Sequence, residues 1–149
     1  MQNVTLGYGR KVVVKDIAFQ MKPGEMLGLV GPNGCGKSTI IKALSRIISP
    51  YSGRILLDGK DISTISRRDL SRWLGVVPQI PLLPSTFTTF EVVLMGRNPH
   101  LGLFQYEAPK DMTIAWRAME KTSTQHLARR RIGELSGGEI QCVVIARVL

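Results

Sequence analysis

The spacing of apolar residues along the chain predicts a mixture of strands and helices. Residues 1–30 are predicted to form strands, and apolar positions stand in short alternation at Val12, Val14, Ile17 and Phe19. Residues 26–30 and 74–78 are apolar runs without alternation, as in strands buried on both faces. From Ser38 the apolar positions recur at helical spacing as far as Pro50. The pattern therefore predicts an α/β fold in which a strand, a loop and a helix follow a strand-rich beginning.

The second half of the chain has a mainly helical pattern. After a proline-interrupted stretch, helical spacing appears at residues 90–95 and again between Pro109 and Lys121, with a loop expected at 96–102. Residues after Ser136 again show the apolar spacing of a helix. A short strand at 53–59 and a capped helix at 66–73 are also predicted.

Composition limits the classes of protein that fit. The apolar share of 44% is that of a folded globular protein, and no apolar run approaches the roughly 20 residues that span a bilayer. The beginning lacks the order of a secretory signal, and Cys35 and Cys142 lie far apart, so we expect a reduced cytosolic protein. The net charge of +9 suits an anionic partner: nucleotide, nucleic acid or an acidic membrane surface. For each single basic cluster, a solvated face is the simpler interpretation.

Residues 31–39 carry the most specific chemical signal. They read Gly-Pro-Asn-Gly-Cys-Gly-Lys-Ser-Thr and fill every fixed position of the P-loop pattern. Glycines let successive N–H groups point at phosphate oxygens, Lys37 adds a cation for the β- and γ-phosphates, and the Ser38 hydroxyl suits Mg²⁺. We therefore predict bound ATP with Mg²⁺. The residues expected to contact ATP here are Gly31, Asn33, Gly34, Cys35 (through its backbone rather than its sulfur), Gly36, Lys37, Ser38 and Thr39.

With three further motifs in order, the sequence resembles the ATP-binding cassette (ABC) ATPases over its whole length. Residues 31–39 are similar to the Walker A motif, 77–79 (Val-Pro-Gln) to the Q-loop, and 135–139 (Leu-Ser-Gly-Gly-Glu) to the signature motif. Tyr8 stands where the family has an adenine-stacking aromatic residue. The resemblance implies a P-loop NTPase with a RecA-like core sheet, an N-terminal antiparallel β region and an α-helical insert.

The resemblance also implies roles for single residues. Tyr8 would stack on the base, although an ordinary strand aromatic is the alternative. Lys37 and Gln79 would be the catalytic residues, and Ser38 and Gln79 the Mg²⁺ contacts, unless Gln79 is only a surface glutamine at a strand end. The ATP held by a partner subunit would be contacted by Ser136, Gly137, Gly138 and Glu139. Two cassettes would therefore bind two ATP molecules as a head-to-tail homodimer.

The resemblance divides the chain into three parts. Residues 1–79 would form the β region and the Walker A part of the core, 80–134 a helical subdomain, and 135–149 the start of the signature helix. Residues 91–104 and 131–139 are similar to importer cassettes for ferric siderophores, haem and cobalamin. In such importers the insert docks on membrane permease subunits at the cytoplasmic face of the plasma membrane. No nucleic acid is expected as a partner, and His100 and His126 are not assigned as metal ligands.

Two family elements have no counterpart in the sequence. No two acidic residues are adjacent, so the Asp-Glu of the Walker B strand is missing, and so is the later switch histidine. We therefore expect a truncated cassette that binds ATP but hydrolyses it negligibly, because phosphoryl transfer depends on those positioned groups. Two alternatives stay open: a soluble ABC ATPase acting on nucleic acid or ribosomes, and a non-hydrolysing remnant.

Overall fold

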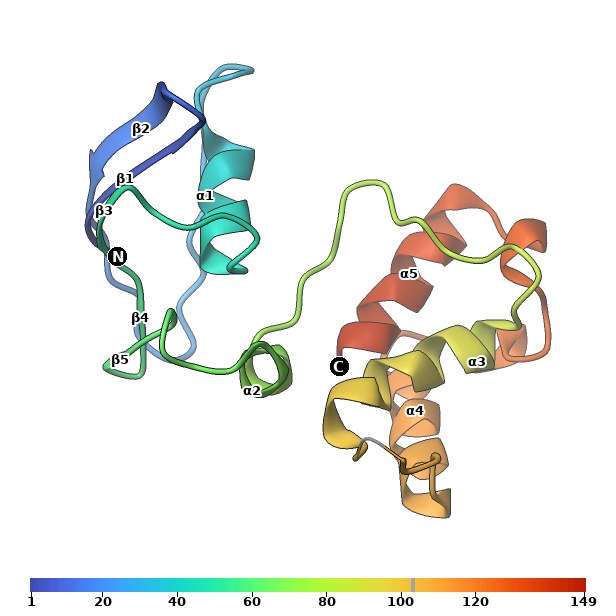
Figure 1. Ribbon diagram of the computed structural model, residues 1–149. Helices are drawn as coiled ribbons and strands as arrows, with labels where there is room; N and C mark the ends of the chain where they lie inside the picture. The colour runs from blue at the N-terminus through green and yellow to red at the C-terminus, as the bar shows by residue number, and fades with distance from the viewer. Residues whose placement is uncertain (103) are drawn as a thin grey trace. The chain divides into compact units, whose positions relative to one another are not determined.

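The computed structural model describes residues 1–102 and 104–149 (Figure 1). Leu103, which belongs to the predicted helical insert, lies outside the described residues. The chain forms two compact units, Met1–Leu70 and Ser71–Leu149. No helix in the described ranges is long and apolar enough to cross a membrane. The three-part division at residues 79 and 134 stays a prediction.

The first unit is built on an antiparallel sheet with a helix packed against it. The sheet has the order β2–β1–β3, from β1 (Gln2–Tyr8), β2 (Lys11–Ile17) and β3 (Ser52–Arg54). Val4 and Leu6 of β1 are fully buried, and they join the apolar side of α1 (Lys37–Leu44) in one core. A small ribbon follows, β4 (Leu56–Leu57) with β5 (Lys60–Asp61), and the boundary between the units falls within the helix α2 (Arg67–Trp73). The predicted N-terminal antiparallel β region is confirmed.

Helix α1 ends earlier than the apolar spacing predicts. The Ser45 hydroxyl donates back to the carbonyl oxygens of Ile41 and Lys42, at 2.9 and 3.2 Å, and Arg46 adopts a left-handed conformation with φ 56°. Such bonds and a left-handed residue are typical of a helix end. Ile47, on the predicted apolar stripe, is consequently 66% exposed. Beyond the end of the helix, the Arg46 guanidinium donates to the carbonyl oxygens of Ser63 and Ile65.

The prediction of buried strands at residues 26–30 and 74–78 is wrong for this structure. Neither segment is a strand, and Met26 and Val30 are each 98% exposed. A strand needs a neighbouring strand to take its backbone N–H and C=O groups. Within residues 1–102 and 104–149 the ladders join only β1 with β2 and β3, and β4 with β5. The apolar composition of these two segments therefore indicates that they are suited to burial, but it does not identify the neighbouring strands that they would need.

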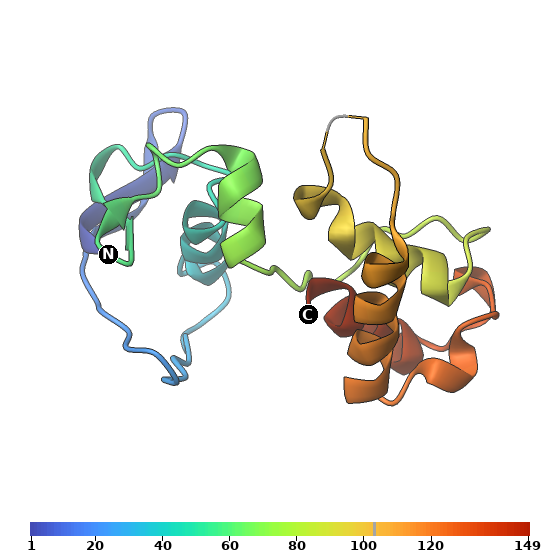
Figure 2. The same ribbon diagram turned by 90° about the horizontal axis from the view of Figure 1, so that it is seen from below.

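The second unit is helical and packs three main helices around one apolar core (Figure 2). Val92, Met119 and Val143, from three different helices, are fully buried there. The predicted helices are confirmed, and the predicted loop at 96–102 is largely a 3-10 helix. The elements are α3 (Thr89–Leu94), η1 (Met95–His100), α4 (Pro109–Lys121), η2 (Gln125–Leu127), η3 (Ile132–Glu134) and α5 (Gly137–Val148).

A short antiparallel pairing joins the segment before α3 to the segment before α5. The amide of Thr89 donates to the Arg130 carbonyl at 2.9 Å, and the buried Thr89 hydroxyl donates to the same oxygen at 3.0 Å. Three more backbone bonds continue the pairing: Phe90 N to Ala128 O (3.1 Å), Ile132 N to Phe87 O (3.0 Å) and Gly133 N to Ser85 O (3.0 Å). The start of α3 and the approach to α5 are therefore fixed to each other.

A buried carboxylate anchors the start of α4. Asp111 is 1% exposed, and its side chain accepts from the backbone N–H of Ala108 at 3.1 Å and from Arg97 Nε at 3.1 Å. The Ala108 hydrogen bond and the Arg97 guanidinium hold the pKa of Asp111 below its ordinary value. This ion pair connects η1 to α4.

We predict that Asp111→Asn lowers the urea midpoint of unfolding at pH 7. Because the folded pKa lies below the ordinary value of about 4, the carboxylate contributes fully above that value and loses its contribution as the pH falls through the folded pKa. The gap between wild type and variant should therefore narrow on acidification to about pH 3. Glu107→Gln, which changes an exposed carboxylate nearby, is the control. A gap that is absent at pH 7, or widens in acid, would contradict this role.

Candidate functional site

The loop at residues 31–36 reaches α1 through a glycine with no room for a side chain. Gly36 is the N-cap of α1, with φ 101°, and a Cβ added there would lie less than 3.0 Å from Val14 Cγ2 of β2. Gly34 also has a positive φ, 82°, but an added Cβ would meet nothing within 4 Å. The loop therefore turns into the helix by pressing its backbone onto β2 at Gly36.

The end of α1 at this loop presents backbone donors and a cation together. The first N–H groups of a helix have no acceptor within it, so those of Lys37, Ser38 and Thr39 are available to an anion. Lys37 Nζ folds over the loop and donates to the carbonyl oxygens of Gly31 at 2.7 Å and Pro32 at 2.8 Å. Its ammonium group therefore lies over the residues predicted to hold phosphate.

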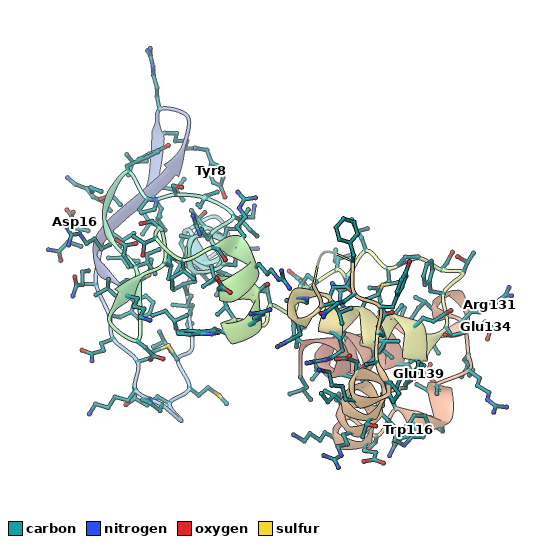
Figure 3. The ribbon with its side chains drawn as sticks, turned by 60° about the horizontal axis from the view of Figure 1, so that its bottom comes forward. Tyr8, Asp16, Trp116, Arg131, Glu134 and Glu139 are labelled. Carbon is teal, nitrogen blue, oxygen red and sulfur yellow. The ribbon has the colours of Figure 1, made fainter. Side chains whose placement is uncertain are left out.

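Tyr8 lies beside the same helix, at the end of β1 (Figure 3). The side-chain hydrogen bond with Thr39 lowers the pKa of the Tyr8 phenol, and Lys42 lowers it further. Lys42 Nζ lies 5.6 Å from the centre of the Tyr8 ring, within cation–π range. The ring is 46% exposed. The first unit thus brings Tyr8 and the phosphate loop to one end of α1, and Lys42 is a neighbour that the sequence alone did not indicate.

The residues at this end of α1 fit a magnesium ion held mainly by phosphate. Ser38 is exposed in the first turn and offers the oxygen ligand that Mg²⁺ prefers. No group of three or more His, Cys, Asp or Glu side chains that could hold a metal occurs among the described residues. Mg²⁺ commonly takes one or two side chains, waters and substrate phosphates, so a sparse donor set is compatible with it. The second predicted contact, Gln79, belongs to the other unit and stays a prediction.

The signature residues form the capped beginning of α5. The Ser136 amide and hydroxyl both donate to Glu139 Oε2, each at 2.7 Å, and Ser136 Oγ accepts from the Glu139 amide at 3.4 Å. A Cβ added at Gly137 or Gly138 would meet nothing within 4 Å. The amides of these two glycines therefore open a helix at an uncrowded surface, which suits an anion.

The Glu139 carboxylate is engaged inside this motif. The Ser136 hydrogen bonds lower the pKa of Glu139, and Arg130 Nη1 lies 3.4 Å from its Oε1. The predicted contact of residues 136–139 with a partner's ATP stays a prediction.

Gln79 is connected to the signature helix. Its side chain is exposed, and its backbone carbonyl accepts a hydrogen bond from Gln141 Nε2 at 2.9 Å. Gln141 could not be predicted from the sequence, because 62 residues separate it from Gln79.

We predict that Gly36→Ala weakens both folding and ATP binding far more than Gly34→Ala. Each alanine is forced into a left-handed conformation, at about 1–2 kcal/mol. At Gly36 the added Cβ also collides with Val14, which should cost about 1–3 kcal/mol more. Urea unfolding and fluorescence titration of the two variants test this. Equal losses in the two variants would show that the close approach of Gly36 to β2 is unimportant.

Comparison with known proteins identifies the family. The ABC transporter family profile matches residues 14–149. The chain is 40% identical over 148 residues to the iron(3+)-hydroxamate import ATP-binding protein FhuC of Bacillus subtilis, covering 99% of this chain and 55% of that protein. It is 42% identical over 147 residues to the hemin import ATP-binding protein HmuV of Pseudomonas fluorescens, covering 99% and 56%.

The structural comparison agrees with this assignment. A nucleotide-free ATP-binding cassette from an ABC transporter matches with a TM-score of 0.85 at 26% identity, over 99% of this chain and 62% of that one. The chain spans about half the length of the curated relatives it matches. The P-loop NTPase fold predicted from the sequence is thereby confirmed, and the chain belongs to the ABC transporter family of ATP-binding proteins.

Proposed function

We propose that this chain is the part of an ABC importer ATPase that carries the Walker A, Q-loop and signature motifs. The importer would take up an iron chelate such as a ferric siderophore, or a related haem or cobalamin substrate. The observation that carries the proposal is the end of α1, where a glycine-rich loop, helix amides and Lys37 converge. The similarity to FhuC, an iron(3+)-hydroxamate import protein, and to HmuV, a hemin import protein, supports the iron-chelate and haem classes.

In this proposal the residues of the first unit bind and orient the nucleotide. Tyr8 offers its exposed ring to adenine, while the loop amides and Lys37 hold the β- and γ-phosphates. Lys37 would exchange the carbonyl oxygens of Gly31 and Pro32 for phosphate oxygens, which bind an ammonium group more strongly because they are charged. A magnesium ion, when bound with ATP beside Ser38, would neutralise charge that develops on the phosphates.

The second unit would complete the site of another subunit. Gln79 would orient the attacking water or contact Mg²⁺, and the amides at the start of α5 would face the γ-phosphate bound to the partner. A head-to-tail homodimer satisfies both requirements, because each ATP then meets the α1 end of one copy and the α5 end of the other. Rate acceleration in such a site comes from positioning and from charge stabilisation.

Docking of permease subunits on the helical unit has its own structural support. A cavity of about 530 Å³ is lined by the start of α3, the middle of α4 and the segment at 125–129, which contributes His126 and Arg129. Phe90 and Trp116 form its aromatic part, with ring centres 6.2 Å apart, and Trp116 is 43% exposed. A large exposed aromatic side chain next to a cavity is typical of an interaction surface. The protein would therefore sit peripherally at the cytoplasmic face of the membrane.

The alternative function on nucleic acid rests on the net positive charge of the chain. One basic residue near the signature motif, Arg130, already contacts groups of the chain itself. Arg130 contacts Glu139 and donates to the Glu134 carbonyl oxygen, so it stabilises the start of α5. That arrangement favours the nucleotide-dependent dimer over a nucleic-acid surface at this place.

Lys37→Ala tests the proposed function. A hydrogen bond to a charged group is worth about 1.5–3 kcal/mol, so the variant should bind Mg·ATP roughly 10- to 100-fold more weakly in a fluorescence titration. Lys15→Ala, which removes an exposed cation from β2, is the matched control and should change affinity less than about twofold, as rim charges usually do. Unchanged affinity in Lys37→Ala would refute the site.

A further inference from the structure

The segment that leads to Gln79 runs along α5 in the opposite direction to the helix. Gly75 lies against the last turn, where an added Cβ would be 3.1 Å from Val148 Cβ and 3.3 Å from the Val148 carbonyl oxygen. Four residues later, Gln79 lies against Gln141, near the first turn. The four steps of extended chain cover about 13 Å and seven helical residues about 10 Å, so the two contacts are mutually consistent.

Gln141 joins this segment to the signature end of the helix. It follows Gly137 by four residues and therefore lies on the same face of α5, one turn further on. Its side chain is half-buried, and Nε2 donates to the Gln79 carbonyl oxygen at 2.9 Å, a normal hydrogen-bond length. The bond leaves the side chain of Gln79 itself exposed and free to reach a ligand.

Backbone bonds fix the chain on the far side of the Q-loop. The amide of Gly133 donates to Ser85 O, and the amide of Thr89 donates to Arg130 O. Residues 80–84 bridge these two attachments, and Ile80 and Leu82 within them are 79% and 95% exposed. The Q-loop is thus attached at both ends to the elements that hold the signature motif: to α5 itself at Gln79, and to the approach to α5 beyond Ser85.

We propose that Gln141 is a positioning residue for Gln79, acting as a side-chain latch between the Q-loop and the signature helix. The inference rests on the proposed function for its catalytic consequence, but the latch itself is a property of the chain. Through it, a displacement of Gln79 on binding nucleotide or permease is transmitted to the amides of the signature motif. The same bond holds the backbone of Gln79, and so fixes the position from which its side chain extends.

Backbone ¹⁵N relaxation on the chain tests the latch without reference to ATP. Loss of the Gln141 bond should lower the order parameters of the amides in residues 75–83 toward about 0.6 in Gln141→Leu, with α4 unchanged. Gln141→Lys keeps a donor of similar reach and should restore the wild-type order parameters. Cys142→Ala, at the exposed neighbouring position, should behave like wild type. Equal order parameters in Gln141→Leu and wild type would overturn the latch, and so would a failure of Gln141→Lys to restore them.

Steady-state kinetics of the complete ATPase subunit then separate the latch from the proposed function. Gln141→Leu should lower kcat about 3- to 10-fold with little change in KM for ATP, because Lys37 and Tyr8 lie in the other unit. Gln141→Lys should recover kcat. An altered KM with unchanged kcat would overturn the positioning role. Absence of any ATPase activity in the wild-type subunit would refute the proposed function, while the relaxation result would still decide whether the latch exists.

Discussion

The phosphate loop depends on the contact between the backbone of Gly36 and the side chain of Val14. Because an added Cβ would come within 3.0 Å of Val14, β2 supports the turn from beneath and fixes where α1 begins. The same strand pairs with β1, whose last residue is Tyr8. One sheet therefore positions the loop, the start of α1 and the aromatic ring. Apolar burial of Val4, Leu6, Ile40 and Ala43 holds the helix on that sheet.

The two glycine-rich helix ends differ in a way that suits different tasks. At α1 the N-cap is a glycine without a side-chain hydrogen bond, so the first amides are open and Lys37 supplies positive charge. At α5 Ser136 and Glu139 cap each other, and Arg130 compensates the carboxylate. The first end can hold a highly charged group by itself, whereas the second presents amides without an excess of cations. A nucleotide held first by α1 and then met by the α5 end of another subunit fits this difference.

Local sequence patterns predicted the features that local chemistry determines. Residues 31–39, the helix at 109–121 and the Ser136 cap follow from glycine, proline and capping residues at fixed spacings. The prediction of strands at 26–30 and 74–78 was wrong because a strand requires a neighbouring strand, and apolar composition does not indicate which segment that neighbour is. Lys42 beside Tyr8, Arg130 beside Glu139 and Gln141 beside Gln79 were missed, because each pairing arises from tertiary packing.

Amide chemical shifts during a titration with Mg·ATP test the central claim most directly. If the α1 end holds the phosphates, the backbone amides of Gly34, Gly36, Lys37 and Ser38 should shift first and most strongly, together with the ring protons of Tyr8. AMP, which lacks the β- and γ-phosphates, should leave the Lys37 and Ser38 amides nearly unchanged. Shifts confined to the basic clusters at residues 67–72 and 129–131, with none at 34–38, would contradict the account.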